Sequence, residues 1–443
     1  MIPNDSPLQF SDEAKKAIDL ITQKDKNVFI TGKAGTGKST LLEYIRMIPA
    51  HKMVVLAPTG IAAIHVKGET IHSFFKLKPG YELDEAKNMR MDAKRAKRYQ
   101  SIQSILIDEI SMVRADILDA INVFLQRARK NDLPFGGVQM IFFGDLFQLP
   151  PVIRNEDKAA FSLNYTSPYF FAAKVFKPQD LFAAPFEMHK VELTKIYRQK
   201  DENFIRVLNA IRENKASQDD LNFLNLRANP NYTPPKHLSY VHLMATNAKA
   251  NSMNYDKLSE ISSMPITFTA SKHGKVGNLQ PNDASITVKV GAQVMFINND
   301  FKKRWVNGTI GKVVSHKKVY DEDLGKQVDA LEVVLENDKK VEVRPHTWEL
   351  SKYSFQEGKF VREQVGHFTQ IPLRLAWAIT IHKSQGKTFD NVIIDLGWGS
   401  FAHGQTYVAL SRCTSLEGLV LKQYLKQSDI IVDEAVKAFH FDK

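Results

Sequence analysis

The sequence contains a single cysteine, Cys413, among its 443 residues. One thiol can form neither an intramolecular disulfide nor a zinc site built from several cysteines. Scarcity of cysteine is typical of proteins that fold in a reducing compartment. We therefore expect a cytoplasmic protein, associated with the nucleoid if the source is bacterial.

Long apolar runs are also missing. No uninterrupted apolar segment approaches the roughly 18 residues that span a bilayer. The N-terminal MIPNDSPLQF lacks the basic and apolar regions of a secretory signal. Hydrophobic residues make up 43% of the chain and charged residues 25%, which is typical of a folded globular protein rather than a disordered one. These features predict a soluble protein with no membrane partner.

Acidic residues are outnumbered by basic ones, which leaves a formal net charge of +11 and an isoelectric point near 9.3. This balance favours a polyanionic partner such as nucleic acid over an acidic small molecule. A surface of solvated lysines is the alternative explanation. The length predicts two to four domains, each with a sizeable core.

Short apolar runs in the first part of the chain are rich in β-branched or aromatic residues, and each ends at Gly, Pro or Asp. They are Asn27 to Thr31, Met53 to Ala57, Ser104 to Asp108 and Gln139 to Gly144. Buried parallel strands have this composition, and the segments between the runs are long enough for helices. We expect an α/β domain over residues 1–187, interrupted by a charged surface insertion over residues 76–100.

The rest of the chain divides into a second α/β domain and an insertion. Further strands are predicted at Val241 to Ala245, Val392 to Leu396 and Leu419 to Leu421. Between them, ITVKV, AQVMFIN, TIGKVV, ALEVVLE and KVEVR alternate with turn residues, which is typical of a small antiparallel barrel. We assign residues 188–264 and 369–443 to the second domain, and residues 265–368 to the inserted β domain.

A phosphate-binding loop follows the first strand. The segment GKAGTGKS matches the pattern G-x-x-x-x-G-K-[ST] and precedes a helical stretch. Glycines let backbone amides approach phosphates, Lys38 reaches the β and γ phosphates, and Ser39 binds magnesium. The residues expected to bind ATP are Gly32, Lys33, Ala34, Gly35, Thr36, Gly37, Lys38, Ser39 and Thr40.

Acidic and amide side chains follow the ends of two predicted strands. The segment SILIDEISM supplies Asp108 for the second ligand sphere of Mg²⁺ and Glu109 as general base for water. Farther along, GDLFQLPPV offers Gln148 as a contact for the γ-phosphate or the attacking water, although a plain turn explains that segment equally well.

Other nucleotide-binding classes lack support. A GTPase would carry an N-K-x-D segment, and the nearest string, residues 214–217, has no acid. The segment HKSQGKT contains a second Gly-Lys-Thr, but a phosphate loop would need glycine where Ile381 stands. One nucleotide site coupled to movement is the better interpretation.

The successive segments resemble a known family. GKAGTGKST, APTGIAAIHVKGETIHSFF, LIDEISMV, FGGVQMIFFGDLFQLPPV, LTKIYRQ, AWAITIHKSQGKTFDNV and YVALSRCTSLEGL are similar, in order, to the motifs of superfamily 1 helicases. The long second segment and FGGVQ before GDLFQLPPV resemble the petite-integration-frequency (PIF) helicases of superfamily 1B, relatives of RecD.

The resemblance implies a fold and an activity. It implies two RecA-like P-loop NTPase domains with parallel sheets and an inserted, SH3-like antiparallel β-barrel. It also implies ATP-driven, 5′-to-3′ translocation on single-stranded DNA, unwinding of forked or structured DNA, other replication or repair proteins as partners, and a monomer in solution.

The resemblance also implies roles for individual residues. Arg198 and Arg412 match the family's arginine fingers, and Gly386 and Lys387 match positions near ATP. Positions that match DNA-facing residues of the family are Thr59, Gly60, His72, Phe74, Asn298, Asn299, Lys302, Lys303, Arg304, Trp305, His382, Ser384 and Gln385.

One departure and two alternatives accompany this assignment. The family's adenine-reading glutamine is missing near Glu13 and Ala14, and Gln9 is the remaining candidate. A nucleotide-gated protein that binds nucleic acid without unwinding it would share every ATP-site residue. An RNA helicase would share the contacts to phosphates and stacked bases, because only contacts to 2′-hydroxyls distinguish RNA.

Overall fold

The computed structural model describes residues 10–48, 53–78, 82–177, 186–235, 238–274, 280–321, 325–356 and 359–441. The chain divides into two compact units. The first contains residues 1–197, 351–364 and 434–443, and the second contains residues 198–350 and 365–433. Within the described parts of the chain, every helix is too short or too polar to cross a lipid bilayer.

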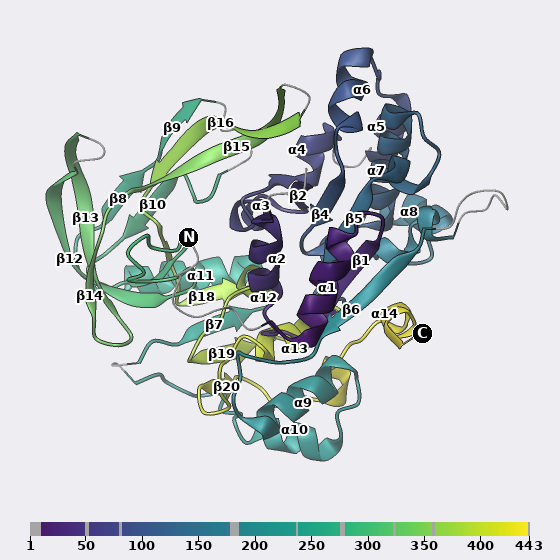
Figure 1. The fold of residues 1–443 in the computed structure, drawn as a ribbon. Coiled ribbons are helices and arrows are strands. Elements are labelled where there is room, and N and C mark those ends of the chain that lie inside the picture. Colours follow the sequence, from purple (N-terminus) through teal and green to yellow (C-terminus); the bar gives the residue numbers. More distant parts are fainter. Residues whose placement is uncertain are drawn as a thin grey trace. The chain divides into compact units, whose positions relative to one another are not determined.

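The first unit is built on a parallel sheet of six strands (Figure 1). Their order is β3 (Glu69–Thr70), β2 (Met53–Ala57), β4 (Ser104–Ile107), β5 (Gln139–Phe143), β1 (Asn27–Gly32) and β6 (Met188–Leu193). The strands β2, β4, β5 and β1 fall on the predicted apolar runs and are buried along almost their whole length. Burial on both faces explains why these runs are continuously apolar rather than alternating.

Helices cover this sheet. They are α1 (Asp12–Thr22), α2 (Lys38–Arg46), α3 (Gly60–His65), α4 (Ile71–Phe75), α5 (Glu82–Asn88), α6 (Ala93–Gln100), α7 (Ala115–Arg129), α8 (Lys158–Asn164) and α14 (Glu434–Phe441). Apolar residues of α1 and α2 pack with β1 and β2 in one core. Figure 1 shows α5, α6 and α7 gathered beside the sheet.

The structure places the first boundary later than predicted. Residues of β6 pair with β1 from Asn27 to Gly32, so the segment after residue 187 completes the first sheet. The alternating polar residues of MHKVEL hide this strand, because it lies at an edge of the sheet. The charged segment 76–100 is not only surface either, since α5 and α6 bury Ala86 and Tyr99.

The second unit contains a parallel sheet of four strands. Their order is β18 (Ala378–Thr380), β7 (Val241–Met244), β19 (Val392–Asp395) and β20 (Leu419–Leu421). The helices of this part are α9 (Glu202–Arg212), α10 (Gln218–Asn225), α11 (Asn247–Ser259), α12 (Ile381–Ser384) and α13 (Gln405–Leu410). The sequence predicts β7, β19 and β20, whereas β18 is hidden inside the apolar AWAITI stretch.

The inserted β segment forms antiparallel sheets around its own core. Five strands pair in the order β14 (Lys340–Val343), β13 (Lys326–Leu335), β12 (Ile310–Asp321), β11 (Gln293–Phe296) and β17 (Leu373–Leu375). Two strands, β10 (Ser285–Val288) and β8 (Ile266–Thr269), form a second sheet. Three, β15 (His346–Gln356), β16 (Lys359–Gln370) and β9 (Ser271–Gly274), form a third.

Residues from the two- and five-stranded sheets share one apolar core. The predicted alternating strands are therefore present, and their sheets enclose this core.

The strands β15 and β16 extend beyond the inserted domain. Residues 351–364, their far end, belong to the first unit. There Tyr353 accepts a hydrogen bond from Val55 N at 3.1 Å and donates its own amide to Glu69 Oε2 at 2.9 Å. The predicted inserted domain, residues 265–368, thus contributes a segment to the first unit.

Candidate nucleotide and nucleic-acid sites

The phosphate loop connects β1 to α2 in the first unit. Gly35 and Gly37 have φ angles of 81° and 84°, which favour glycine. Gly32 is required for space, because a Cβ there would lie 2.6 Å from the carbonyl oxygen of Leu193. The loop ends at the first turn of α2, and the backbone amides and dipole of a helix N-terminus attract anions.

The side chain of Lys38 lies along this loop. Its Nζ donates to the carbonyl oxygens of Gly32 at 2.7 Å and Lys33 at 3.0 Å. Thr36 Oγ1 also donates to Lys33 O, at 2.9 Å. The ammonium group is therefore held at the mouth of a loop whose geometry suits phosphate.

The carboxylates predicted at the end of β4 are neighbours in the structure. Burial, reinforced by the charge of Glu109, raises the pKa of Asp108 to about 7, while Lys38 opposes the shift. Glu109 has a φ of 50°, an unfavourable left-handed conformation for a residue with a side chain. Such strain is concentrated at functional sites, where it orients side chains.

Gln148 lies in a buried polar turn after β5. Its side-chain Nε2 donates to Asp145 Oδ2 at 3.4 Å, and its backbone N–H donates to Asp145 O at 3.0 Å. Both side chains are at least nine-tenths buried. Asp145 thus holds Gln148 in place, and its contact with a phosphate stays a prediction.

Tyr197 is a residue of this site that sequence reasoning missed. Its amide donates to Gly35 O at 2.8 Å, and its ring is 3.7 Å from the place where a Cβ on Gly37 would stand. The side chain is 54% exposed, so its ring is open to a ligand beside the phosphate loop. Gln9 lies outside the described residues.

The four candidates for DNA contact in the first unit differ in exposure. Thr59 is exposed, and its Oγ1 caps α3 by accepting from Ala62 N at 3.2 Å. Gly60 and His72 are partly buried. Phe74 is 4% exposed and packs against Tyr353, with ring centroids 5.7 Å apart. Phe74 is therefore a core residue in this structure, and its contact with DNA stays a prediction.

The HKSQGK segment follows β18 in the second unit. His382 is exposed and Gln385 is partly exposed, but Ser384 is fully buried and donates its hydroxyl to Ile381 O at 2.7 Å. Gly386 has a φ of 74° and open space around it. Lys387 turns toward the inserted β domain, where its Nζ donates to Asn307 Oδ1 at 2.7 Å.

The two predicted arginine fingers make hydrogen bonds inside the second unit. Arg412 is 1% exposed and donates to the carbonyl oxygens of Val408, Ser384 and Lys387 at 3.0, 3.3 and 3.2 Å. Arg198 donates to Ser411 O at 3.1 Å. In this structure both arginines stabilise the second unit by hydrogen bonds to backbone carbonyl groups. Their contacts with a phosphate stay predictions.

The FINNDFKKRW loop of the β insertion separates into two groups. Side chains that build the loop include Asn298, which accepts from Trp305 Nε1 at 3.0 Å, and Arg304, which pairs with Asp300 at 2.7 Å. Trp305 is 6% exposed and packs on Phe296. Asn299 likewise accepts from the amide of Asn307, at 2.8 Å.

The second group of that loop faces solvent. Lys302 and Lys303 are exposed, and Phe301 is 99% exposed. Phe301 is the second residue that sequence reasoning missed. Its signal was an aromatic residue at a turn, directly before two lysines.

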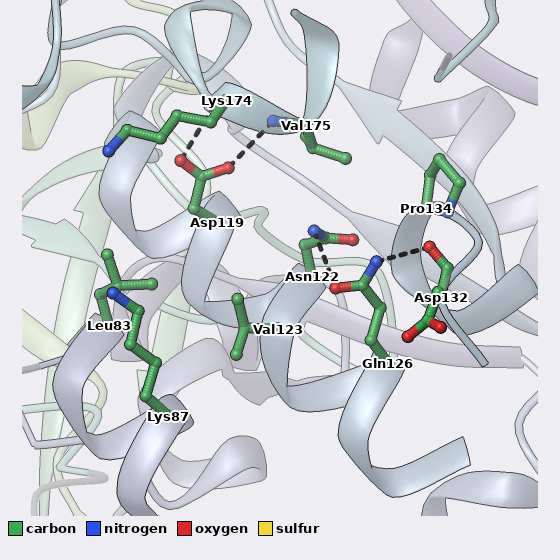
Figure 2. A pocket seen from close by; sticks show the side chains of 10 residues that line it. All are labelled: Leu83, Lys87, Asp119, Asn122, Val123, Gln126, Asp132, Pro134, Lys174 and Val175. Carbon is green, nitrogen blue, oxygen red and sulfur yellow. Dashed lines mark hydrogen bonds between the residues drawn. The ribbon is translucent and has the colours of Figure 1, made fainter. Parts of the chain in front are cut away.

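A cavity of about 220 Å³ in the first unit contains none of the predicted residues. Figure 2 shows it between α5, α7 and the segment at Lys174 and Val175. Its buried carboxylate, Asp119, accepts from the amides of Lys174 at 2.9 Å and Val175 at 3.2 Å. Because Asp119 is satisfied by the fold, we assign the cavity no part in nucleotide chemistry.

Comparisons with known proteins agree on one family. Residues 9–222 match the model of the family described as PIF1-like helicase. The ATP-dependent DNA helicase Pif1 of Bdellovibrio bacteriovorus is 32% identical, with 98% of this chain and 92% of that protein aligned. The ATP-dependent DNA helicase PIF1 of Homo sapiens is 33% identical, with 94% of this chain and 61% of the human protein aligned.

Solved structures give the same result. The crystal structure of Bacteroides sp Pif1 in complex with ADP-AlF4 has a TM-score of 0.85 and 36% identity, and covers 98% of this chain and 96% of that chain. Bacteroides Pif1 bound to ssDNA has a TM-score of 0.66 and 37% identity, with the same coverage of both chains. This chain therefore belongs to the PIF1-like helicase family.

Proposed function

We propose that this protein is an ATP-dependent DNA helicase that translocates 5′-to-3′ on single-stranded DNA and unwinds duplexes. One observation carries the proposal. Strand β1 leads into a phosphate loop with Lys38 at its mouth, and strand β4 leads into the carboxylate pair Asp108 and Glu109. Parallel strands direct their following loops to one edge of the sheet, so these groups act on one ligand.

The nucleotide is ATP with Mg²⁺. Ionisation of Asp108 is opposed by burial and by Glu109, and a divalent cation would remove this penalty by supplying positive charge. Ser39, in the first turn of α2, would hold the cation with its hydroxyl, and Mg²⁺ bound there would supply positive charge beside the phosphates. Glu109 orients and deprotonates the attacking water.

The nucleic-acid partner is single-stranded and forked DNA. Solved relatives include Bacteroides Pif1 bound to ssDNA and two Pif1 helicases at forked dsDNA. In this chain the net charge of +11 and the solvent-facing Phe301, Lys302 and Lys303 support the same partner. Lysines neutralise phosphates and aromatic rings stack on bases, which gives binding without sequence preference. We propose that the protein acts as a monomer with other replication or repair proteins.

Strand displacement on tailed duplexes tests the proposal. We expect ATP-dependent release from a duplex with a 5′ single-stranded tail and little from one with a 3′ tail. Lys38→Ala should abolish both ATP hydrolysis and release. DNA-stimulated hydrolysis without release from either duplex would instead favour a nucleotide-gated binding protein. Faster release of RNA than of DNA strands would favour an RNA helicase.

A further inference from the structure

A loop in the second unit presents two aromatic side chains to solvent. It connects β19 to α13, and in it Trp398 is fully exposed and Phe401 is 64% exposed. A single exposed apolar residue is ordinary. Here two large aromatic residues lie within four positions directly after a strand of a parallel sheet, and ligands of such sheets bind at the carboxyl ends of the strands.

The backbone of this loop is fixed by hydrogen bonds. Gly397 N donates to Asp395 Oδ1 at 2.9 Å, Ser400 N to Asp429 Oδ1 at 3.2 Å, and Phe401 N to Gln405 Oε1 at 3.0 Å. Ordering a loop costs conformational entropy, and this one is ordered although the side chain of Trp398 gains no burial. The contacts that hold it therefore prepare Trp398 for a ligand.

A basic residue lies beside the same loop. Lys249, exposed in the first turn of α11, brings its Nζ within 2.7 Å of the point where a Cβ on Gly397 would stand. The helix α11 follows β7, which pairs with both β18 and β19. The carboxyl ends of β18, β7 and β19 thus carry His382, Lys249 and Trp398 in succession along one edge.

We propose that Trp398, with Phe401 and Lys249, forms a stacking site for a base of single-stranded nucleic acid. The proposal rests on the proposed function and extends the strand-binding surface of the second unit from the HKSQ segment across β7 to the β19 loop. The indole accepts one face of a base, and Lys249 holds the adjoining phosphate. Stacking is tolerant of sequence, so the site grips any base as the strand moves.

The surroundings favour a nucleic acid over a protein partner. The residues between the two rings, Gly399 and Ser400, are small, so the rings are not part of a continuous apolar patch of the kind that protein interfaces bury. Lys249 places a cation beside the loop, the carboxylates of Asp395 and Asp429 accept hydrogen bonds from the loop backbone, and the whole chain is basic. A nucleotide fits this site, because its planar base can stack on an exposed ring and its phosphate can pair with Lys249.

Tryptophan fluorescence gives a direct test on the full-length protein. Of the four tryptophans, Trp305 and Trp348 are buried and Trp377 is partly buried, which leaves Trp398 as the fully exposed one. We expect an oligothymidylate to quench the emission and to protect it from iodide. An abasic oligonucleotide of equal length should bind more weakly and quench little, because it offers phosphates without bases.

Substitutions separate stacking from other effects. Trp398→Phe should keep the affinity for oligothymidylate and lose the quenching. Trp398→Ala should lower the affinity about fivefold and remove most of the preference over the abasic strand, without changing ATP hydrolysis in the absence of DNA. Tyr255→Ala is the control, since Tyr255 is 73% exposed on α11, about 9 Å along the helix from Lys249.

The possible failures are distinguishable. If the wild-type protein binds oligothymidylate with no change in the Trp398 signal, and Trp398→Ala binds equally well, the stacking site is wrong while the helicase proposal stands. If the wild-type protein binds no single strand at all, the proposed function itself fails. If Trp398→Ala instead abolishes a concentration-dependent self-association with unchanged DNA affinity, the loop docks a second copy of the protein and the proposal is overturned.

Discussion

Lys387 Nζ donates a hydrogen bond to Asn307 Oδ1 at 2.7 Å, and this bond joins the segment after α12 to the inserted β domain. Gly308 packs beside the same lysine, because a Cβ there would lie 3.7 Å from Lys387 Cβ. The HKSQGK segment and the loop that carries Phe301 are therefore mechanically connected within one unit. We expect a DNA strand that displaces one of them to move the other.

Burial of Lys387 makes stability depend on pH. Loss of hydration, assisted by repulsion from Arg374, lowers the pKa of Lys387 from 10.5 to about 8. Between these values the unfolded chain keeps a proton that the folded chain has lost, so the free energy of unfolding rises as the pH increases from 8 to 10.5. Lys387→Met should remove this rise, which amounts to no more than about 3 kcal/mol.

Urea unfolding at pH 7.5 and pH 9.5 measures how much the free energy of unfolding rises with pH in the wild type and in Lys387→Met. Lys383→Met is the matched control, since Lys383 is exposed in the same segment. An identical pH dependence for wild type and Lys387→Met would contradict a lowered pKa of Lys387 in the folded protein.

Glu109→Gln separates nucleotide binding from hydrolysis. The substitution keeps the size of the side chain and removes the general base, so DNA-stimulated turnover should fall about 100-fold or more while nucleotide affinity is retained. Turnover and fluorescent-nucleotide binding are measured together, with Glu43→Gln, an exposed site on α2, as control. Unchanged turnover would exclude Glu109 as the base.

Local signals in the sequence predict the centre of the first unit and its phosphate loop. Strands such as β1 and β4 are buried on both faces, so each is a compact apolar run. Gly35 and Gly37 are required by their left-handed backbone conformation. Gly32 is required by the close approach of Leu193, which lies on the adjacent strand β6. Pattern and structure therefore agree there.

The burial of individual side chains depends on tertiary packing, and the sequence did not predict it. Trp305 and Phe301 stand four positions apart in one basic loop, yet one is 6% exposed and the other 99% exposed. The difference depends on packing against Phe296 of β11, whose ring centroid lies 4.4 Å from that of Trp305, and the sequence does not show which of the two aromatic residues makes this contact. Likewise, the burial of Arg412 depends on carbonyl groups from the distant HKSQGK segment.

That pair of aromatic residues yields opposite predictions. Trp305→Ala removes a packed core side chain and should lower the free energy of unfolding by about 3–5 kcal/mol. Phe301→Ala should leave stability unchanged and weaken the binding of single strands about fivefold, as loss of one stacked base does. Thermal unfolding and fluorescence anisotropy measure the two effects. Lower stability in Phe301→Ala would mean that its ring is packed in solution.

Arg412 is expected to support both stability and hydrolysis. Its guanidinium donates to three carbonyl oxygens and to Ser411 Oγ at 2.8 Å, and removal leaves those buried acceptors without their donor. Arg412→Ala should therefore lower the free energy of unfolding by about 3 kcal/mol as well as slow hydrolysis. A residue that acted only on a phosphate would affect hydrolysis alone.

Arg198→Ala is the matched comparison for Arg412→Ala. Among the described residues, Arg198 donates to Ser411 O at 3.1 Å, so its removal should lower the free energy of unfolding by about 1–2 kcal/mol, clearly less than the loss of Arg412. Calorimetry and single-turnover hydrolysis are measured on both variants. If Arg412→Ala unfolds at the wild-type temperature, its buried contacts contribute nothing to the fold. Its effect on hydrolysis would then belong wholly to the nucleotide.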